Sequence, residues 1–193
     1  MSEINYYDEE NHKYYVNGVE KPSVTEICSP ISSDRLNSLP AQVLNNARLR
    51  GEKCHEAFEE YALTGEIDEE EIVPEYAPYI EQFILWFRTY RPKVLFTEKQ
   101  LFGKDFCGTC DLICQIDGKT ILVDYKTTSV ADKKSLSCQL EGYYRLCKGS
   151  KIHIDECWYL HLKKDSYVFK PIERNVRWFD ILLEHNKFMK GEK

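Results

Sequence analysis

The chain has 193 residues, of which 42% are hydrophobic and 30% are charged, and its formal net charge at pH 7 is −6. This balance is typical of one compact globular domain. No stretch reaches the roughly 18 apolar residues that a membrane span needs, and the N-terminus lacks a basic and then apolar leader, so we expect a cytoplasmic protein without a membrane partner. The eight cysteines are therefore interpreted as reduced thiols and not as a disulfide scaffold.

The negative net charge argues at first sight against a nucleic-acid partner, because phosphate binding usually depends on a basic surface. The acidic residues, however, are concentrated in residues 65–71, and a basic stretch follows them. Its side chains are Arg88, Arg91, Lys93, Lys99 and Lys104. Because the charges are segregated in this way, the net charge alone does not exclude DNA.

The N-terminal half begins with strand signals and continues with helical ones. Residues 6–20 pair aromatic strand formers around polar turn residues, which predicts a small β-hairpin. Ser23 followed by Glu26 is the pattern of a capping box, and Pro30 predicts that the helix starting there is brief. Apolar residues at helical spacing then predict one long helix or two abutting helices over residues 41–63, and a further helix over residues 78–90.

From residue 93 the apolar period changes to two. This predicts strands over residues 94–98, 108–116 and 120–126, and Asp117-Gly118 is a strong hairpin turn between the last two. A helix over residues 135–148, a second hairpin over residues 156–172 and a closing helix over residues 176–189 are expected to follow. This order of elements predicts an α/β fold with a central mixed β-sheet flanked by helices.

Two charged residues lie on the strand after the Asp117-Gly118 turn. Asp124 and Lys126 are two positions apart, so both project from one side of the strand. An isolated aspartate and lysine at this spacing would more often be an exposed polar face. Their position within an apolar strand favours a functional site instead.

The partner strand carries a second carboxylate, Asp111. A continuous apolar face is expected from Cys110, Leu112, Cys114 and Ile116. This pattern places Asp111 on the face opposite the core, and a simple hairpin would bring it within one cross-strand step of Asp124. Two adjacent carboxylates repel, and a hard divalent cation such as Mg²⁺ or Mn²⁺ would neutralise them.

Five short motifs resemble those of the PD-(D/E)XK nuclease superfamily, more specifically its RecB-like and lambda-exonuclease-like branch. Residues 50–55 (RGEKCH) are similar to the G-x-x-x-H helix motif, and residues 96–98 (FTE) resemble the upstream glutamate. Residues 108–111 (GTCD), 124–127 (DYKT) and 139–143 (QLEGY) resemble the G-x-x-D strand, the (D/E)-x-K-T strand and the Q-x-x-x-Y helix. Each motif is weak alone, but five in the right order and spacing make a strong signal.

The resemblance covers roughly residues 50–144 and implies a single nuclease domain over residues 1–193 with a restriction-endonuclease-like core. It implies a divalent metal held by His55, Asp111, Asp124 and the backbone carbonyl of Tyr125. Catalysis would rest on Asp111, Asp124, Lys126 and Glu98, with Lys126 activating or positioning the nucleophilic water. Gln139 and Tyr143 would position the catalytic residues or the DNA. Many relatives have glutamate at the place of Asp124, and the shorter side chain lies within the pattern of the family.

Several of these residues have alternative interpretations. Outside the motif set, His55 would more often be a satisfied helix histidine, and Tyr143 could be ordinary core packing. The spacing of Cys107, Cys110 and Cys114 superficially suggests a zinc or iron–sulfur site. Cys110 and Cys114 are expected about 13 Å apart on one strand face, which favours core packing. The cysteine pattern also departs from that of the iron–sulfur relatives, so no cluster is expected.

The resemblance thus implies a divalent-metal-dependent deoxyribonuclease, an exonuclease in preference to an endonuclease, in DNA recombination or repair. Its partner would be DNA, with a second copy of the chain or a helicase or recombination protein as further candidates. The alternatives are an inactive nucleic-acid-binding or partner module on the same fold, and an endonuclease or RNA-directed enzyme with the same cluster.

Overall fold

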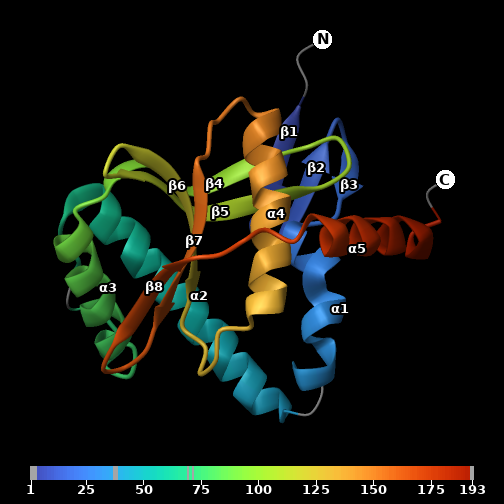
Figure 1. The fold of residues 1–193 in the computed structure, drawn as a ribbon. Helices are drawn as coiled ribbons and strands as arrows, with labels where there is room; N and C mark the ends of the chain where they lie inside the picture. Colours follow the sequence, from blue (N-terminus) through green and yellow to red (C-terminus); the bar gives the residue numbers. More distant parts are fainter. Residues whose placement is uncertain (1–3, 37–38, 69, 71, 192–193) are drawn as a thin grey trace.

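The computed structural model describes residues 4–36, 39–68, 70 and 72–191, so Glu69 and Glu71 of the acidic stretch lie outside the described residues. The helices are α1 (Val24–Leu36), α2 (Ala41–Thr64), α3 (Ala77–Tyr90), α4 (Lys133–Gly149) and α5 (Val176–Met189). The strands of the central sheet are β4 (Lys93–Phe102), β5 (Cys107–Ile116), β6 (Lys119–Lys126), β7 (Glu156–Leu162) and β8 (Tyr167–Pro171). Helices and central sheet form an α/β architecture, as the sequence predicts (Figure 1).

The central sheet is mixed and has the order β4-β5-β6-β7-β8. Asp117 and Gly118 both have positive φ, 51° and 77°, and they form the tight turn between β5 and β6. The chain then crosses over through α4, so that β7 pairs with β6 in parallel, while the other neighbouring strands are antiparallel.

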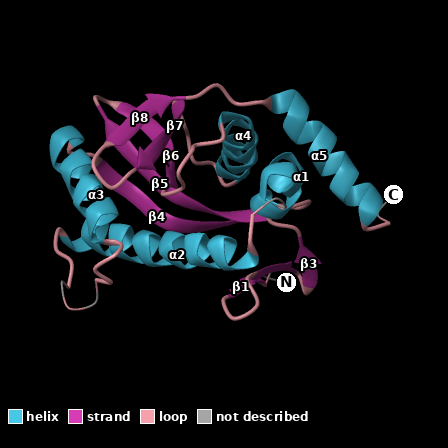
Figure 2. Cartoon of the chain, turned by 90° about the horizontal axis from the view of Figure 1, so that it is seen from below, coloured by secondary structure: helices cyan, strands magenta, loops and turns pink. Residues whose placement is uncertain are grey.

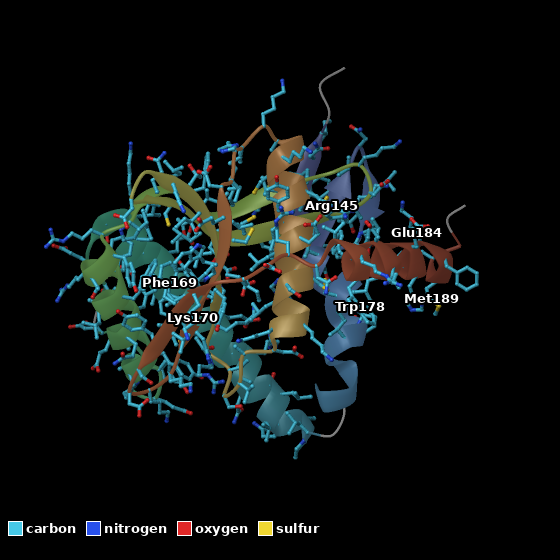
Figure 3. All side chains as sticks on the ribbon, viewed as in Figure 1. Arg145, Phe169, Lys170, Trp178, Glu184 and Met189 are labelled. Atoms are coloured by element: carbon cyan, nitrogen blue, oxygen red, sulfur yellow. The ribbon has the colours of Figure 1, made fainter. Side chains whose placement is uncertain are left out.

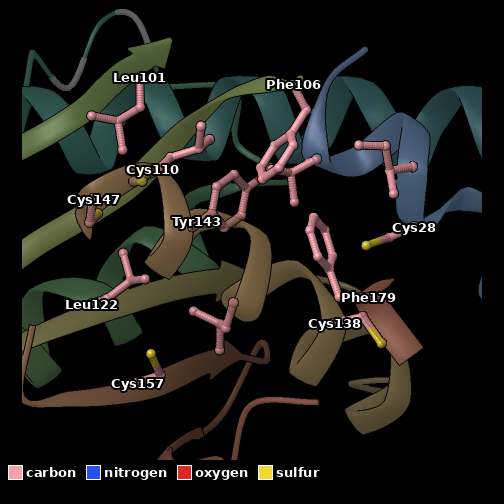
Figure 4. Packing of buried hydrophobic residues seen from close by; sticks show 14 of the residues in the cluster. Cys28, Leu101, Phe106, Cys110, Leu122, Cys138, Tyr143, Cys147, Cys157 and Phe179 are labelled. Carbon is pink, nitrogen blue, oxygen red and sulfur yellow. The ribbon is translucent and has the colours of Figure 1, made fainter. Parts of the chain in front are cut away.

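Helices cover both faces of the central sheet (Figure 2). Helices α1, α4 and α5 pack on one face, and α2 and α3 pack on the other. Cys110 belongs to the core under α4 (Figure 4), whereas Leu112 and Cys114 belong to the core under α2 and α3. The expectation of one continuous apolar face on β5, with Asp111 opposite the core, is therefore wrong. Cys110 shares a core with Ile113, whereas Leu112 and Cys114 belong to the other core, so the alternation of side chains is interrupted between Cys110 and Leu112.

The N-terminal residues form a separate antiparallel sheet of three strands and not a hairpin of two. Its strands are β1 (Asn5–Asp8), β2 (Lys13–Val16) and β3 (Val19–Lys21). Tyr14 of β2 shares a hydrogen bond of 2.8 Å with the hydroxyl of Thr109 on β5. The small sheet thus contacts the central sheet two residues before Asp111.

Helix α1 begins as predicted but is longer than predicted. The Ser23 hydroxyl accepts a hydrogen bond of 3.0 Å from the backbone N–H of Glu26, as a helix cap does. Pro30 lies inside the helix, which continues to Leu36. An internal proline costs a helix roughly 3 kcal/mol. Burial of Val24, Ile27 and Cys28 against α4 and α5 offsets this cost. The sequence around Pro30 does not show that these residues are buried.

Helix α4 is fixed to its surroundings by a buried carboxylate, Glu141, whose side chain is 4% exposed. It accepts a hydrogen bond of 2.7 Å from Arg145, which Figure 3 labels near α5, and it also pairs with Arg174. We expect Glu141→Gln to lower the free energy of unfolding by about 1–3 kcal/mol, because two guanidinium groups lose their shared charge partner.

Urea denaturation of metal-free protein measures this effect. The matched control is Glu184→Gln on α5, whose carboxylate is 75% exposed and lies 3.6 Å from Lys187. This change should alter the stability by less than about 0.5 kcal/mol. Equal midpoints for the two variants would contradict the role given to Glu141.

Candidate metal centre

Three neighbouring strands place three carboxylates at one level of the central sheet. Thr97 pairs with Leu112 and Lys99 with Cys110, so Glu98 of β4 lies opposite Asp111 of β5. The pairing of β5 with β6 extends as far as Leu112 and Val123, which are the sequence neighbours of Asp111 and Asp124. Beyond that pair the Tyr125 N–H donates to the Asp111 side chain, at 2.5 Å from Oδ2.

The backbone at Glu98 is unusual for a strand, because its φ is +40°. A non-glycine residue seldom adopts this region, and such residues gather at functional sites when their surroundings hold them there. The register of β4 against β5 also shifts between Val94 and Phe96. This irregular segment carries Glu98 next to a histidine of α2.

Helix α2 contributes His55, whose Nδ1 lies 3.2 Å from Glu98 Oε1 and 3.8 Å from Asp111 Oδ1. Its ring packs edge-on against Tyr125 with centroids 5.6 Å apart. One ligand atom from each of His55, Glu98 and Asp111 lies within 4.8 Å of the others. An imidazole nitrogen with carboxylate oxygens is a donor set that suits Mn²⁺ and related divalent ions, so these residues fit a metal.

Asp124 and Lys126 share one side of β6, and Lys126 Nζ lies 2.6 Å from Asp124 Oδ2. The Asp124 side chain is 4% exposed and that of Lys126 is 28% exposed. In this arrangement Asp124 is an ion-pair partner of Lys126, outside the group formed by His55, Glu98 and Asp111. The position of Glu98 thus suits a metal ligand better than that of Asp124, whose Oδ2 already pairs with Lys126.

The two positioning residues predicted on α4 differ in what the structure shows. Burial, with Asp111 and Asp124 nearby, raises the pKa of Tyr143 well above its ordinary range, so the phenol stays protonated. Gln139 lies one turn earlier, and its Oε1 is buried without a hydrogen-bond partner in the described part of the chain. The backbone N–H of Tyr125 donates to Asp111, and the Tyr125 carbonyl stays a predicted ligand.

Burial and crowding govern the protonation of this cluster. Burial lowers the pKa of His55, but Asp111 and Glu98 outweigh burial and raise it to about 9. Burial raises the pKa of Asp124 to about 6, although Lys126 acts in the opposite direction. Burial raises the pKa of Asp111 as well, and Glu98 adds to this effect against the opposing charge of His55. Protons thus reduce the repulsion between the carboxylates, and a bound cation could reduce it in the same way.

These shifts predict how pH changes the effect of a metal. The pKa of His55 lies above its unfolded value, so its contribution to stability is complete below about pH 6.5 and is lost as pH rises towards 9. The raised pKa of Asp124 has the same sign, with loss as pH rises through about 6. We expect Mg²⁺ to raise the melting temperature more at about pH 8.5 than at about pH 6, because fewer protons compete with it.

Differential scanning fluorimetry with Mg²⁺ and with EDTA at the two pH values measures this. Asp111→Asn should remove most of the increment at the higher pH. An increment that is equal at both pH values, or larger at the lower one, would contradict the account.

Comparisons with known proteins give little further guidance. No family model matches the chain, and no curated protein matches it. One solved structure, titled "Crystal structure of SSO0001", has 14% sequence identity to this chain and a TM-score of 0.47. The match covers 88% of this chain and 75% of that one. Among the described residues, no helix has the length and apolar character that crossing a membrane requires.

Proposed function

We propose that this chain is a divalent-metal-dependent DNA nuclease that hydrolyses phosphodiester bonds. The observation that carries the proposal is the meeting of His55, Glu98 and Asp111 from three separate elements, with ligand atoms within 4.8 Å. The Asp124–Lys126 pair lies on the next strand. The ordered motif resemblance supports the PD-(D/E)XK superfamily and, within it, an exonuclease of RecB-like type in recombination or repair.

The residues of the cluster have distinct roles in this proposal. His55, Glu98 and Asp111 would hold the metal, and Asp124, whose Oδ2 pairs with Lys126, would be a further ligand. A bound Mg²⁺ or Mn²⁺ supplies a Lewis acid for the phosphate and lowers the pKa of water. The Asp124 and Asp111 charges raise the pKa of Lys126 against the effect of burial, so Lys126 is an ammonium. As such it donates hydrogen bonds to the water or to a phosphoryl oxygen.

A time course on end-labelled DNA tests the proposal. The substrates are linear duplex, single strand and closed circle, each with Mg²⁺, with Mn²⁺ and with EDTA. We expect metal-dependent release of labelled nucleotides from linear DNA, and an intact circle. Cleavage of the circle would indicate an endonuclease. Binding without cleavage in any metal would overturn the nuclease proposal in favour of a binding module.

The absence of an iron–sulfur cluster stays a prediction. Iron and acid-labile sulfide assays on anaerobically purified protein test it, with neither element expected in stoichiometric amount. The thiols of Cys110 and Cys147 lie beside each other in the core under α4 (Figure 4).

A further inference from the structure

Two hollows adjoin the candidate metal centre, and successive stretches of α2 line them. The first has a volume of about 360 Å³ and is strongly acidic. Its lining comprises Gly51, Glu52, His55, Glu56, Glu59 and Glu98. The second is a groove of about 570 Å³ between α2 and the loop from β6 to α4, and it contains Lys126. The first hollow thus borders the cluster at His55 and Glu98, and the groove borders it at Lys126.

The acidic hollow and the groove carry different charges, so they would interact differently with a phosphate. Without metal the four glutamates of the acidic hollow repel a nucleic-acid strand. The groove carries two cations, Lys126 and Arg50. The Arg50 guanidinium lies 5.3 Å from the centre of the Tyr79 ring, and its Nε is buried without a hydrogen-bond partner in the described part of the chain. Arg50 therefore contributes its charge to the groove, whereas its buried Nε does not reach a ligand there.

The groove also has two acidic residues, Glu75 and Asp132. Asp132 caps α4, where its Oδ1 accepts from the N–H groups of Lys134 at 2.9 Å and Ser135 at 3.3 Å. This use of Asp132 reduces its repulsion of an anion. Charge therefore favours the groove over the acidic hollow as the path of a strand.

The walls of the groove are largely aliphatic. They comprise Leu39, Val43, Leu44, Ala47 and Val130. Val43 is 49% exposed and Val130 is 52% exposed, although both are apolar. Apolar side chains gathered in an open groove beside a polar site indicate a ligand surface. Base faces and sugars are the apolar parts of DNA, and base faces are accessible only in an unpaired strand.

We propose that this groove binds the unpaired end of a DNA strand and seats a nucleotide beside the phosphate that is cleaved. The inference rests on the proposed nuclease function and adds a substrate class to it. The aliphatic walls pack against the base and sugar, while Arg50 and Lys126 face the phosphates. The enzyme then acts on single strands and frayed ends in preference to blunt duplex.

The test uses Val43→Asp, which places a negative charge on the exposed wall of the groove. With Mn²⁺, the measured quantity is the rate on a single-stranded oligonucleotide divided by the rate on bis-para-nitrophenyl phosphate, which is too small to span the groove. We expect this ratio to fall about tenfold or more, as loss of a base contact does. Val130→Asp, on the facing loop, should act in the same direction.

The matched control is Val176→Asp at the start of α5, because Val176 is also 49% exposed. It should leave the ratio as in the wild type. An unchanged ratio in both groove variants, or wild-type cleavage of blunt duplex as fast as of single strand, would overturn the inference while the nuclease proposal stands.

If neither substrate is hydrolysed, the nuclease proposal fails. The affinity for single-stranded DNA then tests whether the groove binds an unpaired strand. Fluorescence anisotropy of a labelled single strand in Ca²⁺ should then show affinity about tenfold weaker for Val43→Asp than for Val176→Asp. Equal affinities would overturn the groove assignment as well.

Discussion

Asp111→Asn is expected to reduce metal-dependent DNA cleavage by at least about a hundredfold, because the metal supplies several kcal/mol of transition-state stabilisation and each 1.36 kcal/mol is tenfold in rate. Asp111 lies between the two halves of the centre, with Oδ1 3.8 Å from His55 Nδ1 and Oδ2 2.5 Å from the Tyr125 N–H. Asparagine keeps a carbonyl that accepts from Tyr125 but loses the charge that attracts a cation.

Initial rates with Mn²⁺, at several metal concentrations, measure this loss. Asp165→Asn is the matched control, because Asp165 is an exposed acid on the turn from β7 to β8. It should keep the wild-type rate. Cleavage by Asp111→Asn within a few-fold of that control would remove Asp111 from the site.

Lys126→Ala is expected to lower kcat by about 10²–10⁴-fold, the range typical of a positioned proton donor or acceptor. Its ammonium lies 2.6 Å from Asp124 and is 28% exposed, so it borders both the buried carboxylate and the groove. Since Lys126 is not a ligand, the increase in melting temperature caused by Mn²⁺ should persist in this variant.

Cleavage rate and metal-induced stabilisation, measured together, distinguish the role of Asp111 from that of Lys126. Asp111→Asn should lose both cleavage and the metal-induced stabilisation, whereas Lys126→Ala should lose cleavage alone. Lys170→Ala, an exposed lysine on β8 (Figure 3), is the control for a general loss of positive charge. A variant at Lys126 that cleaves DNA as fast as the Lys170 variant would contradict its catalytic role.

Local sequence signals were sufficient for the elements that carry the carboxylates. The Asp117-Gly118 turn fixes the register of β5 on β6, and this register pairs Leu112 with Val123, which are the neighbours of Asp111 and Asp124 in the sequence. Helix α2 was predicted from its apolar spacing as one helix or two, and it is a single helix. Both predictions depend on contacts close in sequence, which periodicity reports well.

The remaining features depend on contacts distant in sequence. No local pattern shows that α2 places His55 3.2 Å from Glu98, or that Glu98 has a φ of +40°. The sequence did contain a sign that both faces of the sheet are buried, because residues 121–123 are an unbroken apolar run, as is typical of strands covered on two sides. The alternating pattern expected for β5 concealed it.

The motif order predicts one cluster that includes His55, Glu98 and Asp111, and the structure places ligand atoms of these three residues within 4.8 Å of one another. Their function stays a prediction. Pairing of Asp124 with Lys126 was not expected, because the spacing of two residues shows a shared side and not a contact. The motif that includes Arg50 predicts no role for this residue, and the structure places it in the lining of the groove.

The most direct test of the metal centre is anomalous diffraction from a crystal soaked in Mn²⁺ at about pH 8.5, where fewer protons compete with the cation than at lower pH. The account predicts one strong manganese peak bounded by His55 Nδ1, Glu98 and Asp111, at roughly 2.0–2.3 Å from its ligand atoms. A fully soaked crystal with no peak between these side chains would contradict it.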